Sequence, residues 1–254
     1  MKKLTLNIVA DSVVDYLGVY INRSSKSEIE CQIAPFNQVS QVLLSKANAQ
    51  SIFLWTSPDS QIPSFAKLLS FEAIELDSIF KEVEQFASQI NNACKEYEQV
   101  FMLSWIIPEE CYVPLSLTNK SKQGASDVLS RMNIHLSELL KSNNNFHLID
   151  QNILITRFTN PIHDPRLYAM ARIRYSLDYI KYISGKLIPI VKASVQASRK
   201  LIICDLDNTL WNGIIGDDGL EGIKIGSNNP FGEAHLQLQK SLKALKNRGI
   251  LLAI

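Results

Sequence analysis

Short apolar runs alternate with segments of helical periodicity along the whole chain, and this alternation limits the fold more than any other feature. The runs typical of strands span 4–10, 51–55, 99–105, 146–150, 200–205 and 249–254. They are continuously apolar, as expected of strands that are covered on both faces. Between them, residues such as Val83, Ala87 and Ile90 recur at helical spacing. The pattern predicts an α/β protein with a mostly parallel sheet and helices on both faces.

The helical patterns also suggest where the chain divides. They are clearest in 80–97 and 125–140, and a long one runs from about 166 to 197, whereas 107–123 contains Pro108 and Pro114 and predicts a long loop. A new strand begins near residue 200. We therefore expect one domain over 1–195 and a second over 196–254.

Composition excludes several classes of protein. The 254 residues carry a net charge of +1, which gives no general attraction to nucleic acid or to a membrane surface. No apolar run reaches the roughly 18 residues that a membrane helix needs. The four cysteines are scattered and form no CxxC pair, which predicts reduced thiols in a cytoplasmic protein.

The stretch LIICDLDNTLWN, residues 201–212, carries the chemistry. Asp205 follows an apolar strand, and ligands of parallel α/β sheets bind at such strand ends. Asp207 can turn toward the same point, and the repulsion between two carboxylates is relieved by a hard cation such as Mg²⁺. One carboxylate could then attack phosphorus while the other transfers protons, and the Thr209 hydroxyl could brace the turn. Solvated aspartates at the start of a loop are the alternative for a bare DxD.

The string DLDNT resembles motif I (DxDxT) of the haloacid dehalogenase (HAD) superfamily of phosphatases and phosphotransferases. The longer run DLDNTLWNGIIGDDGLEGIKIG is similar to its FkbH-like branch. The resemblance implies that Asp205 is the nucleophile and a Mg²⁺ ligand, and that Asp207 is the general acid/base and binds Mg²⁺ through its main-chain carbonyl. Thr209 would hold Asp207 in place, and Asn208 and Trp211 match the branch pattern. Asn212 departs from it, since glycine is common there.

The segment after the motif has its own signals. NGIIGDDGLEGIKIG contains two short β-type runs around a Gly-Asp-Asp-Gly turn, which predicts a hairpin that covers the carboxylates, or a plain surface hairpin. Asp217 and Asp218 are then turn residues. Asn229 and Pro230 begin a helix that Gly249 ends. His235 is expected on a helix face without a partner, and the expected buried stripe is Phe231, Leu238, Leu242 and Leu245.

A HAD site requires further groups: a serine or threonine, a lysine and more acidic residues. FkbH-like proteins also carry a cysteine implicated in holding an acyl group. These groups would follow the strand GILLAI, which ends at Ile254. We therefore expect that the sequence is truncated early in the HAD domain and that this piece alone shows no appreciable phosphatase activity.

Residues 1–195 resemble the N-terminal region of FkbH-like proteins, a flavodoxin-like fold similar to SGNH hydrolases. The matching strings are FLWTSPD (53–59), RMNIHL with Asn133, and HDPRLYAMARIRYS (163–176). In an SGNH esterase the nucleophile would be Ser12, but Ile153 stands where a histidine should follow Asp150. His163 lies farther along. Without a base, serine is a weak nucleophile, so Ser12 capping the first helix or turn is the other interpretation.

Basic residues dominate 166–200, where Asp178 is the one acid and the cations are Arg166, Arg172, Arg174, Lys181, Lys186, Lys192, Arg199 and Lys200. They predict either a solvated helix face or a docking surface for an acidic carrier protein or a phosphorylated substrate.

Together these observations indicate Mg²⁺-dependent phosphatase or phosphotransferase chemistry on a phosphorylated small molecule. In FkbH-like proteins the resemblance implies that glyceryl passes from an acyl phosphate to an acyl carrier protein. The N-terminal domain is then a non-catalytic scaffold that recognises a carrier or partner, which we prefer, or an SGNH-type esterase.

Overall fold

A computed structural model of the chain describes residues 3–109, 111, 114, 118–120, 124–195, 200–227 and 229–254. The chain forms two compact units, Met1–Lys192 and Ala193–Ile254. Residues 196–199, where we expect the boundary, and part of the expected loop 107–123 lie outside the described residues.

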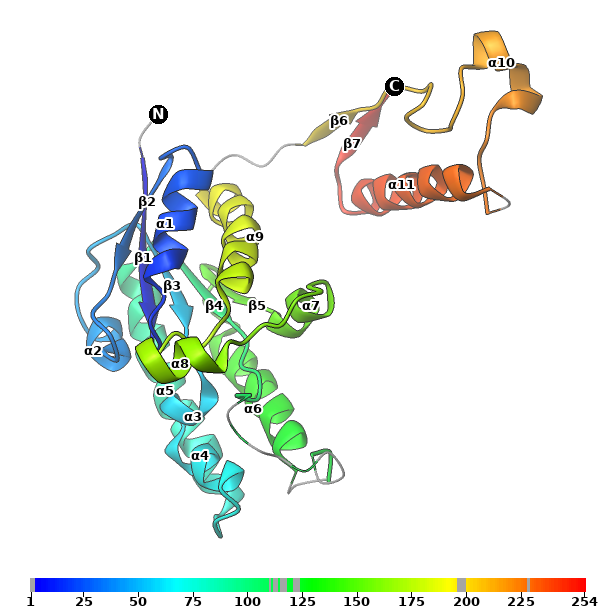
Figure 1. The fold of residues 1–254 in the computed structure, drawn as a ribbon. Coiled ribbons are helices and arrows are strands. Elements are labelled where there is room, and N and C mark those ends of the chain that lie inside the picture. The colour runs from blue at the N-terminus through cyan, green and yellow to red at the C-terminus, as the bar shows by residue number, and fades with distance from the viewer. Residues whose placement is uncertain are drawn as a thin grey trace. The chain divides into compact units, whose positions relative to one another are not determined.

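The first unit is built on a five-stranded sheet with the order β2-β1-β3-β4-β5 (Figure 1). Every strand pair in it is parallel. Its strands are β1 Leu4–Ala10, β2 Ile29–Ile33, β3 Ser51–Trp55, β4 Gln99–Leu103 and β5 Phe146–Ile149. This is the order of flavodoxin-like doubly wound sheets, so the predicted fold class is confirmed.

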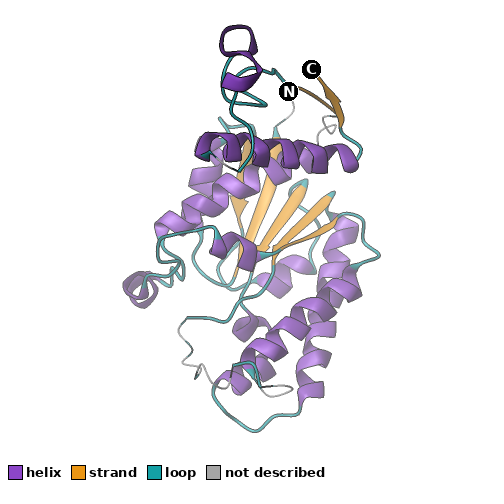
Figure 2. Ribbon diagram, turned by 90° about the vertical axis from the view of Figure 1, so that its right-hand side faces the viewer, coloured by secondary structure: helices purple, strands orange, loops and turns teal. Residues whose placement is uncertain are grey.

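Helices cover both faces of this sheet (Figure 2). They are α1 Asp15–Ser24, α2 Val39–Leu43, α3 Pro58–Gln61, α4 Pro63–Leu69, α5 Leu76–Glu96, α6 Ala125–Leu140, α7 Gln151–Thr156, α8 Pro165–Ala171 and α9 Leu177–Val195. Successive residues of β3 point to opposite faces. Leu54 enters a core with α2, α4, α5 and α6, and Phe53 enters a second core with α1 and α9. Because both faces are covered, the strands are apolar without alternation.

Two expectations about the first unit are wrong. Strand β2 was not expected, because only its first residue, Ile29, is buried and Glu30 and Gln32 are exposed. The helix expected over 166–197 is two helices. Arg172 adopts a left-handed conformation (φ 57°, ψ 26°) that ends α8, and Ile173–Tyr175 are buried before α9 begins.

The second unit contains β6 Leu201–Ile203, α10 Ile215–Gly222, α11 Pro230–Asn247 and β7 Leu251–Ala253, with β6 and β7 paired in parallel. As predicted, Asn229 caps α11 by accepting hydrogen bonds from the backbone N–H groups of Phe231 and Gly232. The expectation of a buried strand and stripe is wrong here, since Ile203 is 73% exposed and Phe231 64%.

Within the described residues no helix is both long and apolar enough to cross a bilayer.

Candidate functional site

Asp205 and Asp207 follow the carboxyl end of β6, as their sequence pattern predicts. The Asp205 side chain is exposed, and its Oδ1 accepts a hydrogen bond from the N–H of Leu206 at 2.9 Å. In Asp207, Oδ1 accepts from the indole Nε1 of Trp211 at 3.0 Å and from the N–H of Ile215 at 3.1 Å. Oδ1 of Asp207 is therefore fixed by two donors, and Oδ2 is the oxygen that remains for chemistry.

Hydrogen bonds between its own residues stabilise the turn after Asp207. Asn208 has a positive φ of 54°, a conformation that asparagine tolerates better than most residues. Its Oδ1 accepts from the N–H of Gly213 at 3.0 Å, and its own N–H donates to the Gly213 carbonyl at 3.2 Å. The hydrogen bonds found for Thr209 involve its backbone, so its hydroxyl role stays a prediction.

Side chains of helix α11 also form hydrogen bonds with the backbone of this turn. Nδ1 of His235 lies 2.8 Å from the Thr209 carbonyl oxygen, and Nε2 of Gln239 donates to the Leu210 carbonyl at 2.6 Å. His235 and Gln239 are four residues apart and so share one helix face. The expectation that His235 has no partner is therefore wrong.

The hairpin expected after the motif is a helix. Residues Ile215–Gly222 form α10, interrupted at Gly219 (φ 68°, ψ 178°), and only the antiparallel bridge between Asn212 and Lys224 resembles a hairpin. Asp218 lies in the first helical turn and accepts a hydrogen bond from the N–H of Ile214 at 2.8 Å. The side chain of Asp218 thus satisfies a free helix-end N–H group, which explains why a turn-like GDDG begins a helix.

The oxygen atoms at this site are of the chemical type that Mg²⁺ binds. Mg²⁺ prefers carboxylate and carbonyl oxygens, keeps several waters, and is often held by one or two protein carboxylates. The Asp205 carboxylate and the Asp207 main-chain carbonyl offer such oxygens. In the described part of the chain, no group of three or more His, Cys, Asp or Glu side chains is arranged to hold a metal.

A second polar cluster lies at the carboxyl edge of β1 and β3 in the first unit. Asp11 Oδ2 accepts hydrogen bonds from the N–H of Ser57 at 2.6 Å and from its hydroxyl at 2.9 Å. Nε2 of Gln61 donates to the same oxygen at 3.3 Å. Burial raises the pKa of Asp11, while the Ser57 hydrogen bonds and the nearby Arg174 oppose that rise.

Arg174 belongs to this cluster and not to a solvated helix face. Its side chain is 8% exposed, and its two terminal nitrogens lie 3.2 and 3.3 Å from the carboxylate oxygens of Asp59. Arg172 is exposed and lies over the Tyr168 ring at 5.3 Å, and Lys192 pairs with Glu28 at 2.7 Å. The basic segment is therefore split between interior and surface. Arg199 lies outside the described residues.

The geometry does not assemble a serine-histidine pair. Nδ1 of His163 lies 3.2 Å from the Arg174 carbonyl oxygen, and Nε2 lies 3.6 Å from a Glu109 oxygen. Both nitrogens are thus engaged by groups other than the Ser12 hydroxyl. Ser12 does not cap α1 either, since Val14 holds the N-cap position without a side-chain hydrogen bond. Asp150 caps α7 by accepting from the N–H of Asn152, and Ile153 is 48% exposed.

Asn133, quoted above for its family-like context, ties α6 to the end of β4. Its Oδ1 accepts from the N–H of Trp105, and its Nδ2 donates to the Trp105 carbonyl, both at 2.9 Å. The Trp105 indole in turn donates to the Thr56 hydroxyl at 3.0 Å. These bonds fix the strand ends around Asp11 and Ser57.

Comparison with family models decides the assignment. The model for FkbH, N-terminal domain, matches residues 5–192. The chain belongs to this family. The resemblance of the FkbH N-terminal domain to residues 1–195 is thus confirmed. No curated protein matches the chain.

A solved structure shows the same fold. The N-terminal part of BF1531 from Bacteroides fragilis, described as containing a phosphatase domain and complexed with Mg, aligns with a TM-score of 0.77 and 24% identity over 99% of this chain and 68% of its own. At that identity the likeness shows the fold alone. A lipase/acylhydrolase from Enterococcus faecalis aligns at a TM-score of 0.48 and 9% identity, over 78% of this chain and 99% of its own. That likeness is too distant to inform function.

Two pairings at these sites were not predicted from the sequence: Arg174 with Asp59, and His163 with Glu109. Asp59 and Arg174 are 115 residues apart, and Glu109 lies in the expected loop before α6. No local pattern marks such pairs. Gln239 could have been found, because it follows His235 by one helical turn on the face that meets the motif.

Proposed function

We propose that Asp205 and Asp207 perform Mg²⁺-dependent phosphoryl chemistry of the HAD type. The anchoring of Asp207 carries this proposal: the two donors on its Oδ1 hold the carboxylate still and leave Oδ2 for proton transfer. Asp205, exposed at the strand end, is accessible to a phosphate. The BF1531 structure, described as holding a phosphatase domain and Mg, supports the same class.

Each carboxylate has a defined task in this proposal. The Asp205 carboxylate attacks phosphorus, and the bond from phosphorus to the leaving oxygen breaks. Asp207 Oδ2 gives that oxygen a proton, and later takes one from the water that cleaves the aspartyl-phosphate. Mg²⁺, held by the Asp205 carboxylate and the Asp207 carbonyl, would offset the negative charge of the carboxylates and the phosphate.

The finer activity that we propose is that of FkbH-like proteins. A glyceryl acyl phosphate would lose phosphate, and its glyceryl group would pass to an acyl carrier protein. Family membership supports this assignment. We also propose a cytoplasmic location.

The test uses a small phosphoryl donor. The chain is incubated with Mg²⁺ and acetyl phosphate, and phosphoprotein is measured by intact mass; Mn²⁺ binding is measured by water-proton relaxation. We expect both signals in the native chain and in Asp217→Asn, and neither in Asp205→Asn. Unchanged signals in Asp205→Asn would refute the proposal.

We propose in addition that the N-terminal domain is a scaffold that binds an acidic carrier. Helix α8 contributes no buried residue, the Arg166 side chain is 88% exposed, and Arg172 is exposed at its end. These cations could meet acidic groups of a partner. Charge reversal of Arg166 and Arg172 should weaken carrier binding. Arg174 is unsuitable for this test, because it is buried against Asp59.

The esterase alternative finds less support in this geometry. Both ring nitrogens of His163 lie against other groups, the Arg174 carbonyl and the Glu109 carboxylate. The scaffold is the role that we prefer for this domain.

A further inference from the structure

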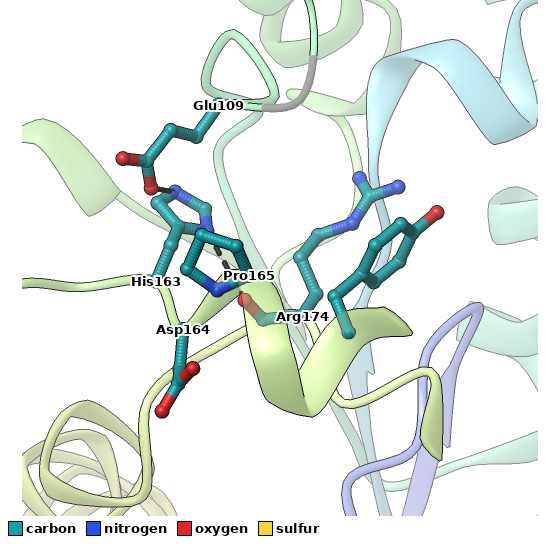
Figure 3. A pocket seen from close by; sticks show the side chains of 6 residues that line it. Glu109, His163, Asp164, Pro165 and Arg174 are labelled. Atoms are coloured by element: carbon teal, nitrogen blue, oxygen red, sulfur yellow. Dashed lines mark hydrogen bonds and ion pairs between the residues drawn. The ribbon is translucent and has the colours of Figure 1, made fainter. Parts of the chain in front are cut away.

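A cavity of about 260 Å³ lies in the first unit, where the segment after β4 meets the start of α8. It is lined by Glu109, His163, Asp164, Pro165, Tyr168 and Arg174 (Figure 3). All six residues belong to the first unit, whereas the Asp205 loop belongs to the second. Its volume is slightly below that of the usual ligand pocket, so the cavity suits only a small molecule.

The imidazole of His163 is the fixed polar group of this cavity. Its side chain is 7% exposed, and its ring stacks on Tyr175 with centroids 5.3 Å apart. Because Nδ1 lies 3.2 Å from the Arg174 carbonyl oxygen, Nδ1 carries a proton and donates it there. This bond fixes the ring plane and directs Nε2 toward Glu109 (Figure 3).

Glu109 is the exposed partner of this buried histidine. Its side chain is 59% exposed, yet one carboxylate oxygen lies 3.6 Å from Nε2 of a nearly buried histidine. An ion pair with so exposed a carboxylate contributes little stability. A carboxylate brought by a ligand could therefore take the place of the Glu109 carboxylate at small cost.

The remaining charges of the lining are already engaged. The Asp164 carboxylate turns to α8, where it accepts from the N–H groups of Arg166 and Leu167, and it points away from His163 in Figure 3. Arg174 pairs with Asp59 and lies 5.7 Å from the centre of the Tyr168 ring. Arg174 thus places at the wall a guanidinium that is paired with Asp59, while Tyr168 and Pro165 supply flat, largely apolar surface.

We propose that this cavity binds a small organic carboxylate with a flat or short apolar body, and that Glu109 competes with it for His163. The ligand's carboxylate would bind the imidazolium form of His163, in which both ring nitrogens carry protons: Nδ1–H donates to the Arg174 carbonyl and Nε2–H donates to the ligand. Its body would lie against Tyr168 and Pro165. This is proposed as a binding site, because the described lining of the cavity offers His163 as a hydrogen-bond donor beside apolar surface.

The test titrates the full chain with benzoate, and with benzamide as the neutral analogue, at constant ionic strength. The imidazole C–H signals of His163 are followed by NMR and assigned with His163→Gln, while His135, His147 and His235 serve as internal references. We expect benzoate to shift the His163 signals saturably and benzamide to leave them unchanged. Benzoate that shifts no His163 signal, or benzamide that binds equally well, would overturn the proposal.

A matched pair of variants tests the competition. Glu109→Gln removes the internal carboxylate and should tighten benzoate binding at least threefold. Glu84 forms a comparable surface pair with His135, at 3.4 Å and with a side chain 54% exposed. Glu84→Gln should shift the His135 signals and leave benzoate affinity unchanged. If Glu109→Gln binds benzoate no more tightly than Glu84→Gln does, Glu109 is not a competitor and the proposal fails.

Discussion

Nδ1 of His235 lies 2.8 Å from the carbonyl oxygen of Thr209, so α11 holds the turn that follows Asp205 and Asp207. The helix therefore does more than connect β6 to β7. It fixes the backbone on which the proposed proton-transfer group is mounted.

Removing the His235 hydrogen bond should loosen that turn. His235→Phe keeps a ring but loses the donor, and should cost the second unit about 1 kcal/mol, the net worth of an ordinary hydrogen bond. Mn²⁺ affinity, measured by proton relaxation, should fall with it. His235→Asn places an amide N–H near the former Nδ1 and should restore binding. Equal Mn²⁺ affinity in His235→Phe and the native chain would contradict this role.

Breaking the Arg174–Asp59 pair should destabilise the first unit. Arg174→Met leaves Asp59 without its bidentate partner and Asp11 without a nearby positive charge. Because the Asp59 side chain is 24% exposed, its loss of the partner should cost about 1–3 kcal/mol, the penalty for a polar group left unsatisfied. Urea unfolding would measure it, with Arg166→Met as the control, because the Arg166 side chain is 88% exposed and its loss should change little. Similar unfolding midpoints for both variants would show that the pair contributes nothing.

Asp11 should make the first unit less stable as pH rises. Burial raises its pKa in the folded state, so above the ordinary aspartate pKa the unfolded chain has lost a proton that the folded chain still holds. Stability then falls as pH increases through the interval between the two pKa values. Asp11→Asn should flatten that fall in urea midpoints measured from pH 4 to pH 7, while the exposed Asp217→Asn should not. A steeper pH dependence in Asp11→Asn would reverse the sign of the argument.

Gly232 should not tolerate a side chain. A Cβ there would lie 2.8 Å from the Gly226 carbonyl oxygen and 3.1 Å from the Ile225 carbonyl carbon, which are backbone atoms that cannot rotate away. Gly232→Ala should therefore destabilise the start of α11 by roughly 1–3 kcal/mol, as overpacking does. Gly216 has open space around its Cβ position, so Gly216→Ala is the control. Hydrogen exchange at the N-terminal turns of α11 would separate the two; equal protection would contradict the clash.

Phosphatase turnover by this chain should be low. Within the described residues no third acidic, cysteine or histidine side chain joins Asp205 and Asp207 to complete a metal site. Hydrolysis of p-nitrophenyl phosphate with Mg²⁺ should therefore remain near background, even where single phosphorylation of Asp205 is detected. Robust turnover that Asp205→Asn abolishes would contradict this prediction.

The sequence predicted well those strands whose two faces are both buried, because such strands must consist of apolar residues. Strands β1 and β3 begin and end where their apolar runs do, because both faces of each strand are covered. Strand β2 was not predicted from the sequence, because it lies at the sheet edge, where Glu30 can face solvent. The end of α8 at Arg172 was not predicted, because neither glycine nor proline marks it. The left-handed conformation of Arg172 is explained by the packing of the buried Ile173–Tyr175 segment, which the sequence does not reveal.

The candidate sites, too, could be predicted from the sequence only in part. The carboxylate pair at β6 could be predicted, since a strand and two aspartates are adjacent in the chain. The Asp11–Ser57 and Arg174–Asp59 contacts could not, because they join segments that only the parallel strand order brings together.

The strand order also affects how the chain is made. Strand β1 is synthesised first but lies between β2 and β3, and its Leu6, Ile8 and Val9 are fully covered in the finished fold. Until Ser51–Trp55 has been translated, a nascent chain presents this apolar strand with an unpaired edge. Such edges invite aggregation or chaperone capture. The interval between the synthesis of β1 and that of β3 is therefore one in which this strand is open to aggregation or to binding by a chaperone.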